Sequence, residues 1–344
     1  MRKLKWGILA LGLLLLTACG KKEPIFSSKQ AVSGQITEKP QPQSEFVITM
    51  DGNEIACGGV WFGETAFVHP QLMDMLGMTE SEALRISVGG ITYLSLEELC
   101  LEADCALISD VEENHVYLTT KAGQWEIPEG YSVPTLMYHG VSDDMWGMTE
   151  LFVKPAEMEK QIKYLVENGY TPIWFEDLVN VDKIEKPVIL TYDDGYVDNY
   201  VDLFPILQKY KVKVTIFLVT GTIDNNPNSL TSEQIREMAQ SGLVSFQSHT
   251  VSHPYLRGQS REMQEYELKQ SAQDVAAITG KMPAVICYPS GSFDETTLEL
   301  ARKYYRMGIN MNGNEYITGE DPYKVDRYYI RRQDGLGTFI QYIQ

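Results

Sequence analysis

The sequence has few cysteines, few positive charges and no apolar run long enough to span a membrane. Five cysteines in 344 residues are too few for a disulfide scaffold. Lysine and arginine number 29 against 47 aspartates and glutamates, which gives a net charge of -18. A chain this acidic repels phosphate backbones, so we expect no nucleic-acid partner. Because 44% of the residues are hydrophobic, the chain can still build a core, and its length allows about two domains.

Residues 1–18 have the pattern of a secretory signal peptide. Three basic residues precede the apolar run from Ile8 to Leu16, which is shorter than the ~20 residues that a bilayer-spanning helix needs. The stretch LTAC that ends at Cys19 resembles a bacterial lipobox, in which the cysteine becomes lipidated. This resemblance implies an extracytoplasmic protein, lipid-anchored to the bacterial cell membrane. The alternative is an ordinary secretory signal followed by a chance cysteine.

Two shorter segments precede the large domain. Residues 19–44 are rich in Lys, Pro, Ser, Gln and Gly, which predicts a flexible tether. Residues 45–122 predict a small α+β domain, with strands at Phe46 to Met50 and His115 to Thr119 and a helix from Glu97 to Ala103. The pattern resembles the small domain first named from the N-terminus of copper amine oxidases. The name does not imply copper, and the predicted role is that of a spacer or wall-contact module.

The small domain contains cysteines and histidines, but their spacing does not match a metal-binding or redox site. Cys57, Cys100 and Cys105 are not at CxxC spacing, so a zinc knuckle or thioredoxin-like site is not expected. Outside the cytoplasm, one disulfide among these three is expected instead. His69 and His115 lie far apart without ligand-like spacing, so we interpret them as surface or packing residues.

Residues 131–344 alternate short apolar runs with amphipathic segments. This alternation predicts βα units, which build a parallel sheet covered by helices, either open or closed into a barrel. The expected strands are Val133 to Tyr138, Val188 to Tyr192, Val212 to Val219, Leu243 to Phe246 and Ala284 to Tyr288. The expected helices are Pro155 to Asn168, Phe204 to Tyr210, Ser232 to Gln240, Arg261 to Thr279 and Glu295 to Tyr304.

Polar side chains follow four of these strands. His139, the pair Asp193-Asp194, His249 and Ser290 each come at or just after a strand end. In parallel α/β folds the carboxyl ends of the strands carry the functional site. The four positions together therefore indicate one site at that end.

The aspartate pair precedes a glycine. Adjacent side chains of an extended chain point to opposite sides, and Gly195 allows the sharp turn that could bring Asp193 and Asp194 to one place. Two carboxylates in one pocket repel each other unless a cation intervenes. The alternative interpretation is a solvated Asp-Asp-Gly turn.

The segment HTVSH places His249 and His253 four residues apart, on one helical turn or in a tight loop. Imidazoles at this spacing suit zinc, which uses three protein ligands and one open position in catalytic sites. Taken together, the two motifs outline a hydrolytic zinc site with three ligands and one base. Two unrelated loop histidines are the alternative.

The motifs TYDDG, HTVSH and CYPSG resemble those of the polysaccharide deacetylases, the NodB-homology or carbohydrate esterase family 4 enzymes. The match runs from about Val133 to Arg332 in the family's order. The opening LMYHGV resembles the branch that contains poly-N-acetylglucosamine deacetylases and peptidoglycan deacetylase-like lipoproteins. The fold that the resemblance implies is α/β, a distorted (β/α)7 barrel, preceded here by the small α+β domain and the tether.

The resemblance also implies roles for single residues. Asp193 matches the general base, and Asp194, His249 and His253 match the ligands of Zn²⁺ or of another divalent transition metal. Ser290 stands where the family usually has an aromatic residue, and its backbone N–H would help to stabilise the oxyanion, which does not require a particular side chain.

The chain departs from the family pattern at two places. Cys287 replaces an arginine that steadies the base in many members, although the related branch commonly lacks that arginine. The family's late Leu-x-His acid is absent, because no histidine follows His253. His139 is the candidate replacement, in a catalytic or substrate-contacting role. The alternatives are a structural role for His139, a water as the acid, or a slow or inactive enzyme.

The predicted function is metal-dependent removal of N-acetyl groups from a cell-wall or surface polysaccharide, the expected partner. Peptidoglycan, poly-N-acetylglucosamine, chitin oligomers and acetylated xylan are all compatible substrates. The main alternative is a catalytically impaired, glycan-binding deacetylase-like lipoprotein. A zinc peptidase or amidase is weakened by the absence of HExxH. A purely structural lipoprotein leaves the paired motifs unexplained. Candidate sugar-stacking residues are Tyr288, Trp146 and Trp174, although aromatic residues are more often part of a core.

Overall fold

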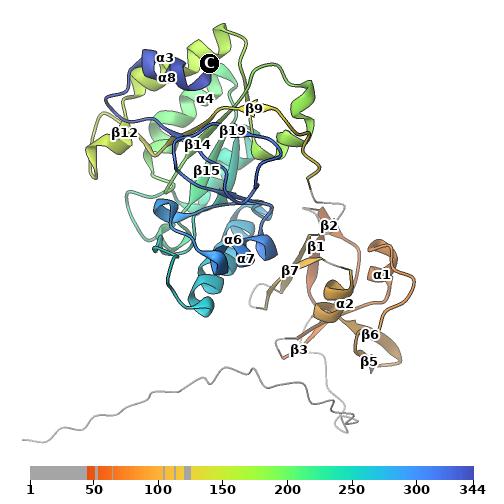
Figure 1. Cartoon of the computed structure of the whole chain (residues 1–344). Helices are drawn as coiled ribbons and strands as arrows, with labels where there is room; N and C mark the ends of the chain where they lie inside the picture. Colours follow the sequence, from red (N-terminus) through yellow and green to blue (C-terminus); the bar gives the residue numbers. More distant parts are fainter. Residues whose placement is uncertain (1–44, 51–52, 64, 104, 112–113, 120–124) are drawn as a thin grey trace, which may run out of the picture. The chain divides into compact units, whose positions relative to one another are not determined.

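The computed structural model describes residues 45–50, 53–63, 65–103, 105–111, 114–119 and 125–344 (Figure 1). The predicted signal peptide, the tether and Cys19 lie outside these residues. In the part of the chain that is described, no helix has both the length and the apolar character needed to cross a membrane.

The small domain is built from two sheets of four strands. One sheet has the order β2-β1-β8-β7 and the other β3-β4-β6-β5. The strands are β1 (Val47–Met50), β2 (Asn53–Ile55), β3 (Gly59–Phe62), β4 (Thr65–Val68), β5 (Arg85–Val88), β6 (Ile91–Ser95), β7 (Ala106–Asp110) and β8 (His115–Thr119), and the helices are α1 (Gln71–Met75) and α2 (Leu96–Glu102). Buried apolar residues of both sheets form one core, in which the rings of Phe46 and Trp61 lie 4.8 Å apart.

The disulfide expected in this domain is absent. Cys57 and Cys100 are free thiols. Every pairing among the three candidate cysteines includes one of these two, so the prediction is wrong. Both thiols are buried in the apolar core, where they pack as small hydrophobic side chains.

The large domain is a parallel sheet of eight strands that curls into a distorted barrel. Seven strands follow the order β18-β17-β16-β15-β14-β10-β20, and β13 pairs with β14 off this path. Their bounds are β10 (Thr135–Tyr138), β13 (Thr171–Ile173), β14 (Pro187–Tyr192), β15 (Val214–Leu218), β16 (Val244–Ser248), β17 (Val285–Cys287), β18 (Met307–Ile309) and β20 (Tyr328–Tyr329). The (β/α) barrel predicted from the sequence is thereby confirmed.

The last strand brings the two edges of the sheet together. Tyr328 in β20 pairs with Leu136 in β10, while Val325, just before β20, forms a bridge to Ile309 in β18. Arg327 lies between these two contacts. The segment that joins the edges therefore also delivers a residue to the interior of the barrel.

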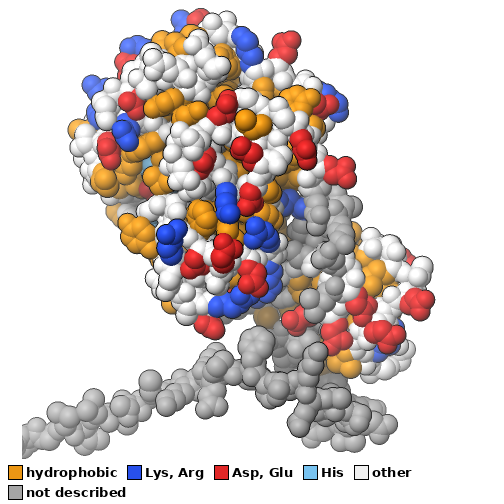
Figure 2. All heavy atoms as spheres, in the orientation of Figure 1, with side chains coloured by type: hydrophobic (Ala, Val, Ile, Leu, Met, Phe, Trp, Pro, Cys, Tyr) orange, Lys and Arg blue, Asp and Glu red, His pale blue; other side chains and the backbone are white. Residues whose placement is uncertain are grey.

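Helices cover the outside of the barrel. They are α3 (Pro155–Glu167), α4 (Phe204–Tyr210), α5 (Ser232–Gln240), α6 (Arg261–Thr279), α7 (Glu295–Tyr304) and α8 (Leu336–Ile343). Helices α3, α4 and α8 pack together, and α6 packs along α7 (Figure 1). Ser260 caps α6 by accepting a hydrogen bond from the Met263 N–H, and Gly280 ends this helix in the left-handed conformation. Figure 2 shows acidic and basic side chains interspersed over α6 and α7, where Arg261 pairs with Glu299 at 2.8 Å.

Shorter elements connect the strands and helices. They are η1 (Thr149–Leu151), η2 (Phe175–Lys183), η3 (Asn199–Leu203), η4 (Thr220–Thr222) and η5 (Pro289–Gly291), and the strand pairs β9 (Ser132–Val133) with β19 (Tyr316–Ile317) and β11 (Gly140–Val141) with β12 (Phe152–Val153). Apolar side chains of η2 pack with Phe217, Val285 and Ile309 inside the barrel. The interior is therefore a packed core, and polar groups are left to gather at the carboxyl ends of the strands.

Candidate metal and catalytic site

The two aspartates lie where β14 ends and the chain turns. The Asp193 N–H donates to the carbonyl of Tyr138 at 2.9 Å, which continues the pairing with β10 for one residue. Asp194 and Gly195 then adopt φ values of 72° and 65°. A Cβ at Gly195 would lie 2.7 Å from Leu218 Cδ2, so a side chain there would clash as well as being strained. This turn directs both carboxylates to one place, as the sequence predicts.

The two histidines belong to a tight loop after β16. His249 continues the strand, since its N–H donates to the Leu218 carbonyl at 2.8 Å. Thr250 and His253 both have positive φ, 68° and 57°. The buried carboxylate of Glu267, from α6, fixes the loop by accepting hydrogen bonds from the N–H groups of residues 251 and 252 at 2.8 and 2.9 Å. A loop of this kind, and not a helical turn, gives both imidazoles the same direction.

Asp194, His249 and His253 converge. Asp194 Oδ1 lies 3.5 Å from His249 Nε2 and 3.6 Å from His253 Nε2. One ligand atom from each residue lies within 4.8 Å of the others. The sequence separates Asp194 and His249 by more than fifty residues, and the neighbouring strands β14, β15 and β16 bring them to one end of the sheet.

The donor set fits a divalent transition metal. His249 Nδ1 lies 2.8 Å from the Cys287 carbonyl oxygen, which as an acceptor fixes the tautomer with the proton on Nδ1. Nε2 then keeps its lone pair toward Asp194, the arrangement found behind metal-bound imidazoles. Burial lowers the pKa of His249 to about 4, so the ring is neutral, as a metal ligand must be. Two imidazoles and one carboxylate form a ligand set typical of catalytic zinc.

A second set, Asp193, His249 and Cys287, also satisfies the distance condition. It is the poorer metal site for two reasons. Burial raises the pKa of the Cys287 thiol well above its usual range, so the sulfur is protonated. Both oxygens of Asp193 are already engaged by a cation, which would repel a metal ion.

That cation is Arg327, which the sequence analysis missed. Its two terminal nitrogens donate to Asp193 Oδ1 at 2.7 Å and Oδ2 at 2.8 Å, a bidentate pair in which both residues are buried. The same guanidinium donates to Thr191 Oγ1 at 2.8 Å, to the Asn310 carbonyl at 3.0 Å and to Cys287 Sγ at 3.1 Å. These partners hold it against the carboxylate.

The pairing sets the charge of Asp193. Burial alone would raise the pKa of this carboxyl, but the adjacent guanidinium outweighs the burial and holds the pKa well below its usual range. Asp193 is therefore anionic at neutral pH. Cys287 stands where the resemblance implies an arginine beside the base, and Arg327, just before β20, contacts the Asp193 carboxylate.

The comparisons with known proteins agree with this geometry. The sequence profile described as polysaccharide deacetylase matches residues 180–308, which include both motifs. YxkH of Bacillus subtilis (strain 168), assigned by its name to the polysaccharide deacetylases, is 35% identical over 218 residues, covering 62% of this chain and 76% of YxkH. The chain belongs to the polysaccharide deacetylase family.

Two further members show how far the similarity extends. A poly-β-1,6-N-acetyl-D-glucosamine N-deacetylase of Staphylococcus aureus (strain MRSA252) is 24% identical over 213 residues, covering 54% of this chain and 72% of that protein. The solved structure of the Streptococcus pyogenes deacetylase PplD in complex with acetate has a TM-score of 0.59 and 29% identity, covering 62% of this chain and 99% of PplD. The similarity thus extends over nearly the whole of the solved PplD chain.

His139 lies beside Asp193. The register Tyr138 with Tyr192 places the next residues, His139 and Asp193, side by side just beyond the ends of β10 and β14. The His139 carbonyl accepts a hydrogen bond from Asn199 Nδ2 at 2.9 Å. Its buried Nδ1 has no hydrogen-bond partner among the described residues. A role for His139 in proton transfer stays a prediction.

Ser290 occupies an exposed turn after β17, with φ 53°. Ile286 in β17 pairs with Ser248 in β16, so this turn is at the same end of the sheet as His249. The structure therefore brings all six predicted catalytic and metal-binding positions to the carboxyl ends of the strands. Their functional roles remain predictions.

The three candidate sugar-stacking residues lie in different environments. Tyr288 is buried and donates from its hydroxyl to the Tyr323 carbonyl at 3.1 Å, so it belongs to the core and cannot stack on a sugar. Trp146 is 41% exposed, and its ring lies edge-on to the ring of Tyr196 with the two centres 4.5 Å apart. Tyr196 is the residue that follows the turn with the two aspartates. Trp146 therefore stays a candidate at the rim of the site. Trp174 lines a separate cavity described below.

Proposed function

We propose that this chain is a zinc-dependent hydrolase that removes N-acetyl groups from a cell-wall or surface polysaccharide, of the peptidoglycan or poly-N-acetylglucosamine type. The observation that carries the proposal is the convergence of Asp194, His249 and His253 beside the anionic Asp193. The S. aureus relative named as a poly-β-1,6-N-acetyl-D-glucosamine N-deacetylase supports the substrate class, and the acetate in the PplD structure supports acetate as the product.

The residues divide the reaction among them. Asp194, His249 and His253 would hold the zinc ion, which supplies Lewis acidity that polarises a carbonyl and lowers the pKa of a water from 15.7 toward about 7. Asp193 accepts the proton of the attacking water. The Ser290 N–H donates to the oxyanion that forms as water adds to the N-acetyl carbon. His139 then donates a proton to the leaving amine, so one water and one amide become acetate and a free glucosamine unit.

Arg327 keeps Asp193 in the charged form that can accept a proton, but it also makes Asp193 a weaker base. A base with a strongly lowered pKa is always ready to accept a proton but accepts it weakly. The bidentate pair therefore makes Asp193 a weak base, and a metal held by Asp194, His249 and His253 would supply the rest of the activation of the water. Arg327 also removes one argument for the catalytically impaired alternative, because the contact that Cys287 cannot make is present.

We also propose that the protein lies outside the cytoplasm on a lipid anchor at Cys19. This places a deacetylase next to wall and surface glycans. The support is the sequence pattern of residues 1–19.

Acetate release and bound metal test the proposal together. The purified chain should contain zinc after dialysis without chelator and should release acetate from at least one of peptidoglycan, poly-N-acetylglucosamine, chitin oligomers and acetylated xylan. Asp193→Asn should keep the metal and lose about 10²–10⁴-fold in turnover. Asp194→Asn should lose the metal as well. The matched control is Asp182→Asn at an exposed position, which should change neither quantity.

Two results would contradict the proposal. A wild-type chain without zinc would reject the metal site. Acetate release by Asp193→Asn at the wild-type rate would reject Asp193 as the base. If the metal is bound and none of the four glycans releases acetate, the catalytically impaired glycan-binding protein is the better description.

A further inference from the structure

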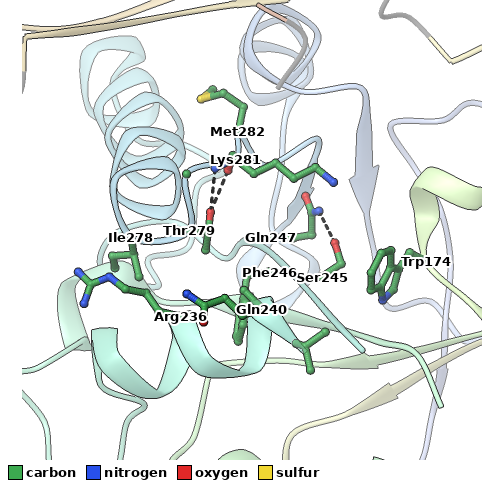
Figure 3. Close-up of a pocket in the computed structure, with 13 residues that line it drawn as sticks. Trp174, Arg236, Gln240, Ser245, Phe246, Gln247, Ile278, Thr279, Lys281 and Met282 are labelled. Carbon is green, nitrogen blue, oxygen red and sulfur yellow. Dashed lines mark hydrogen bonds between the residues drawn. The ribbon is translucent and has the colours of Figure 1, made fainter. Parts of the chain in front are cut away.

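A cavity of about 350 Å³ lies in the deacetylase domain away from the catalytic residues (Figure 3). It is lined by residues of β16 and of the C-terminal ends of α5 and α6, with Trp174 at one side. Val244, in its wall, is at the start of β16, whereas His249 follows the end of the same strand. At about 3.3 Å per residue, Val244 is about 16 Å from His249 along the strand, while Gln247, the lining residue nearest to the metal ligands, is about 7 Å from it.

The polar wall of this cavity is already fixed by hydrogen bonds. Gln247 Oε1 accepts from the N–H groups of residues 284 and 285, both at 2.8 Å. Gln247 Nε2 donates to Ser245 Oγ at 2.8 Å, as Figure 3 shows, and to Glu176 Oε1 at 2.9 Å. Ser245 Oγ donates to the same Glu176 oxygen at 2.8 Å. Oε1 of Glu176 thus accepts from both donors, and these bonds hold Gln247 and Ser245 in place along the wall.

The aromatic side of the cavity is equally fixed. Lys213 Nζ lies 4.5 Å from the centre of the Trp174 ring and is held there by Asp177 Oδ2 at 2.9 Å. A tryptophan ring held in place beside planar polar side chains is the combination that binds the apolar face and the hydroxyl groups of a sugar. The volume is at the lower end of the range for small-ligand sites, which suits a single sugar unit.

Two cations at this cavity have no counterion. Arg236 and Lys281 both line it and are exposed, and neither forms an ion pair with another described residue. In Figure 3, Lys281 extends toward Gln247 and Trp174, while Arg236 lies at the other end beside Ile278. In a chain with 47 acidic and 29 basic residues, unpaired cations beside a preformed cavity favour a ligand of negative charge.

We propose that this cavity is a second, non-catalytic binding site for an acidic sugar, a pyranose unit that bears a carboxylate or a phosphate. The ring packs against Trp174, and the acidic group is held by Lys281 or Arg236. Such a site would keep the enzyme on an anionic wall polymer while the catalytic end deacetylates elsewhere. The inference does not rest on the proposed deacetylation, because binding needs neither metal nor turnover.

Calorimetric titration of the full chain tests the proposal with four probes. They are D-glucuronate, glucose 6-phosphate, glucose and acetate. The two acidic sugars should bind about tenfold more tightly than glucose or acetate, because a charge-assisted contact adds to the ring contact. Which of the two binds more tightly distinguishes a polymer with carboxylates from one with phosphodiesters.

Variants locate the binding. Arg236→Ala/Lys281→Ala should remove the tenfold preference for the acidic sugars. Trp174→Ala should weaken all three sugars. Both cations are exposed, so the double variant should fold normally even if Trp174→Ala does not. The matched control, Lys160→Ala/Lys163→Ala on the exposed face of α3, should bind as the wild type does.

A metal centre can also bind anions, so His253→Ala serves as the second control. The acidic sugars should bind this variant with unchanged affinity. The proposal is overturned if the wild type binds glucose as tightly as glucuronate and glucose 6-phosphate. It is equally overturned if the Arg236/Lys281 variant keeps the preference, or if the binding disappears in His253→Ala.

Discussion

Replacement of Arg327 with glutamine should destabilise the deacetylase domain strongly. The substitution removes both hydrogen bonds to Asp193 and leaves a carboxylate that is 3% exposed without its cation. Breaking a buried ion pair by removing one partner costs about 3–5 kcal/mol. For a domain of this size, that corresponds to a fall of about 6–20 °C in the melting temperature.

The loss should depend on pH in a defined direction. In the wild type, the lowered pKa of Asp193 contributes stability above the unfolded pKa of about 3.9, and this contribution is lost as the pH falls through the folded value. In Arg327→Gln, burial without the guanidinium raises the pKa of Asp193. The Asp193 carboxyl must then bind a proton when the variant folds, which costs more free energy as the pH rises. The difference in melting temperature should therefore be larger at pH 7 than at pH 5.

Thermal unfolding of the purified chains at the two pH values measures this difference. Arg302→Gln is the matched control, because Arg302 makes an exposed pair with Asp321 at 3.8 Å, whose loss should cost under about 1 kcal/mol. Asp193→Asn/Arg327→Gln should recover part of the stability, since both charges leave the interior together. If Arg327→Gln has the same melting temperature as the Arg302→Gln control at pH 7, the buried Asp193 carboxylate does not need the guanidinium, and the reasoning is refuted.

Three further predictions concern the site and its support. Glu267→Ala should lower zinc affinity about 10–100-fold, because the loop that carries both histidines loses the carboxylate that accepts its backbone hydrogen bonds. Competition with a chelator measures the affinity, and an unchanged value would show that the loop keeps its conformation without Glu267. His139→Ala should lower turnover about 10²-fold or more with bound zinc unchanged, and equal turnover would leave His139 a structural residue. Gly308→Ala should destabilise the domain by about 1–3 kcal/mol in urea unfolding, because its Cβ would overlap the buried ring of Tyr288. Gly335→Ala, which meets no atom within 4 Å, is the comparison, and equal midpoints for the two would refute the overlap.

Local pattern in the sequence was enough to predict most of the barrel elements. Helices α5, α6 and α7 have the bounds that their apolar spacing and end signals predict. The strand from Val133 to Tyr138 is in fact two, β9 and β10, because Pro134 lacks the N–H that a continuous ladder needs. Helix α8 and the π-helical turn η3 were not predicted, since their sequences carry no distinct capping signal.

The site divides in the same way. The motifs around Asp193 and His249 were visible because each places several polar residues within five positions at a strand end. Arg327 was invisible because it stands alone, 134 residues from Asp193, and its contact exists only once β20 has joined the edges of the barrel. The missing arginine at position 287 was the available signal, since an unpaired buried carboxylate requires a cation from elsewhere in the chain.

The same closure leaves Cys287 buried beside Asp193. Its sulfur has no accessible surface and lies 3.1 Å from the guanidinium of Arg327. An alkylating reagent can reach this sulfur only when the barrel opens. Cys57 and Cys100 are also buried, at 7% and 2% exposure, in the core of the small domain. Each of the two folded domains thus contains a buried native cysteine. The rate at which a reagent labels that cysteine would measure how often the domain opens, without any engineered probe.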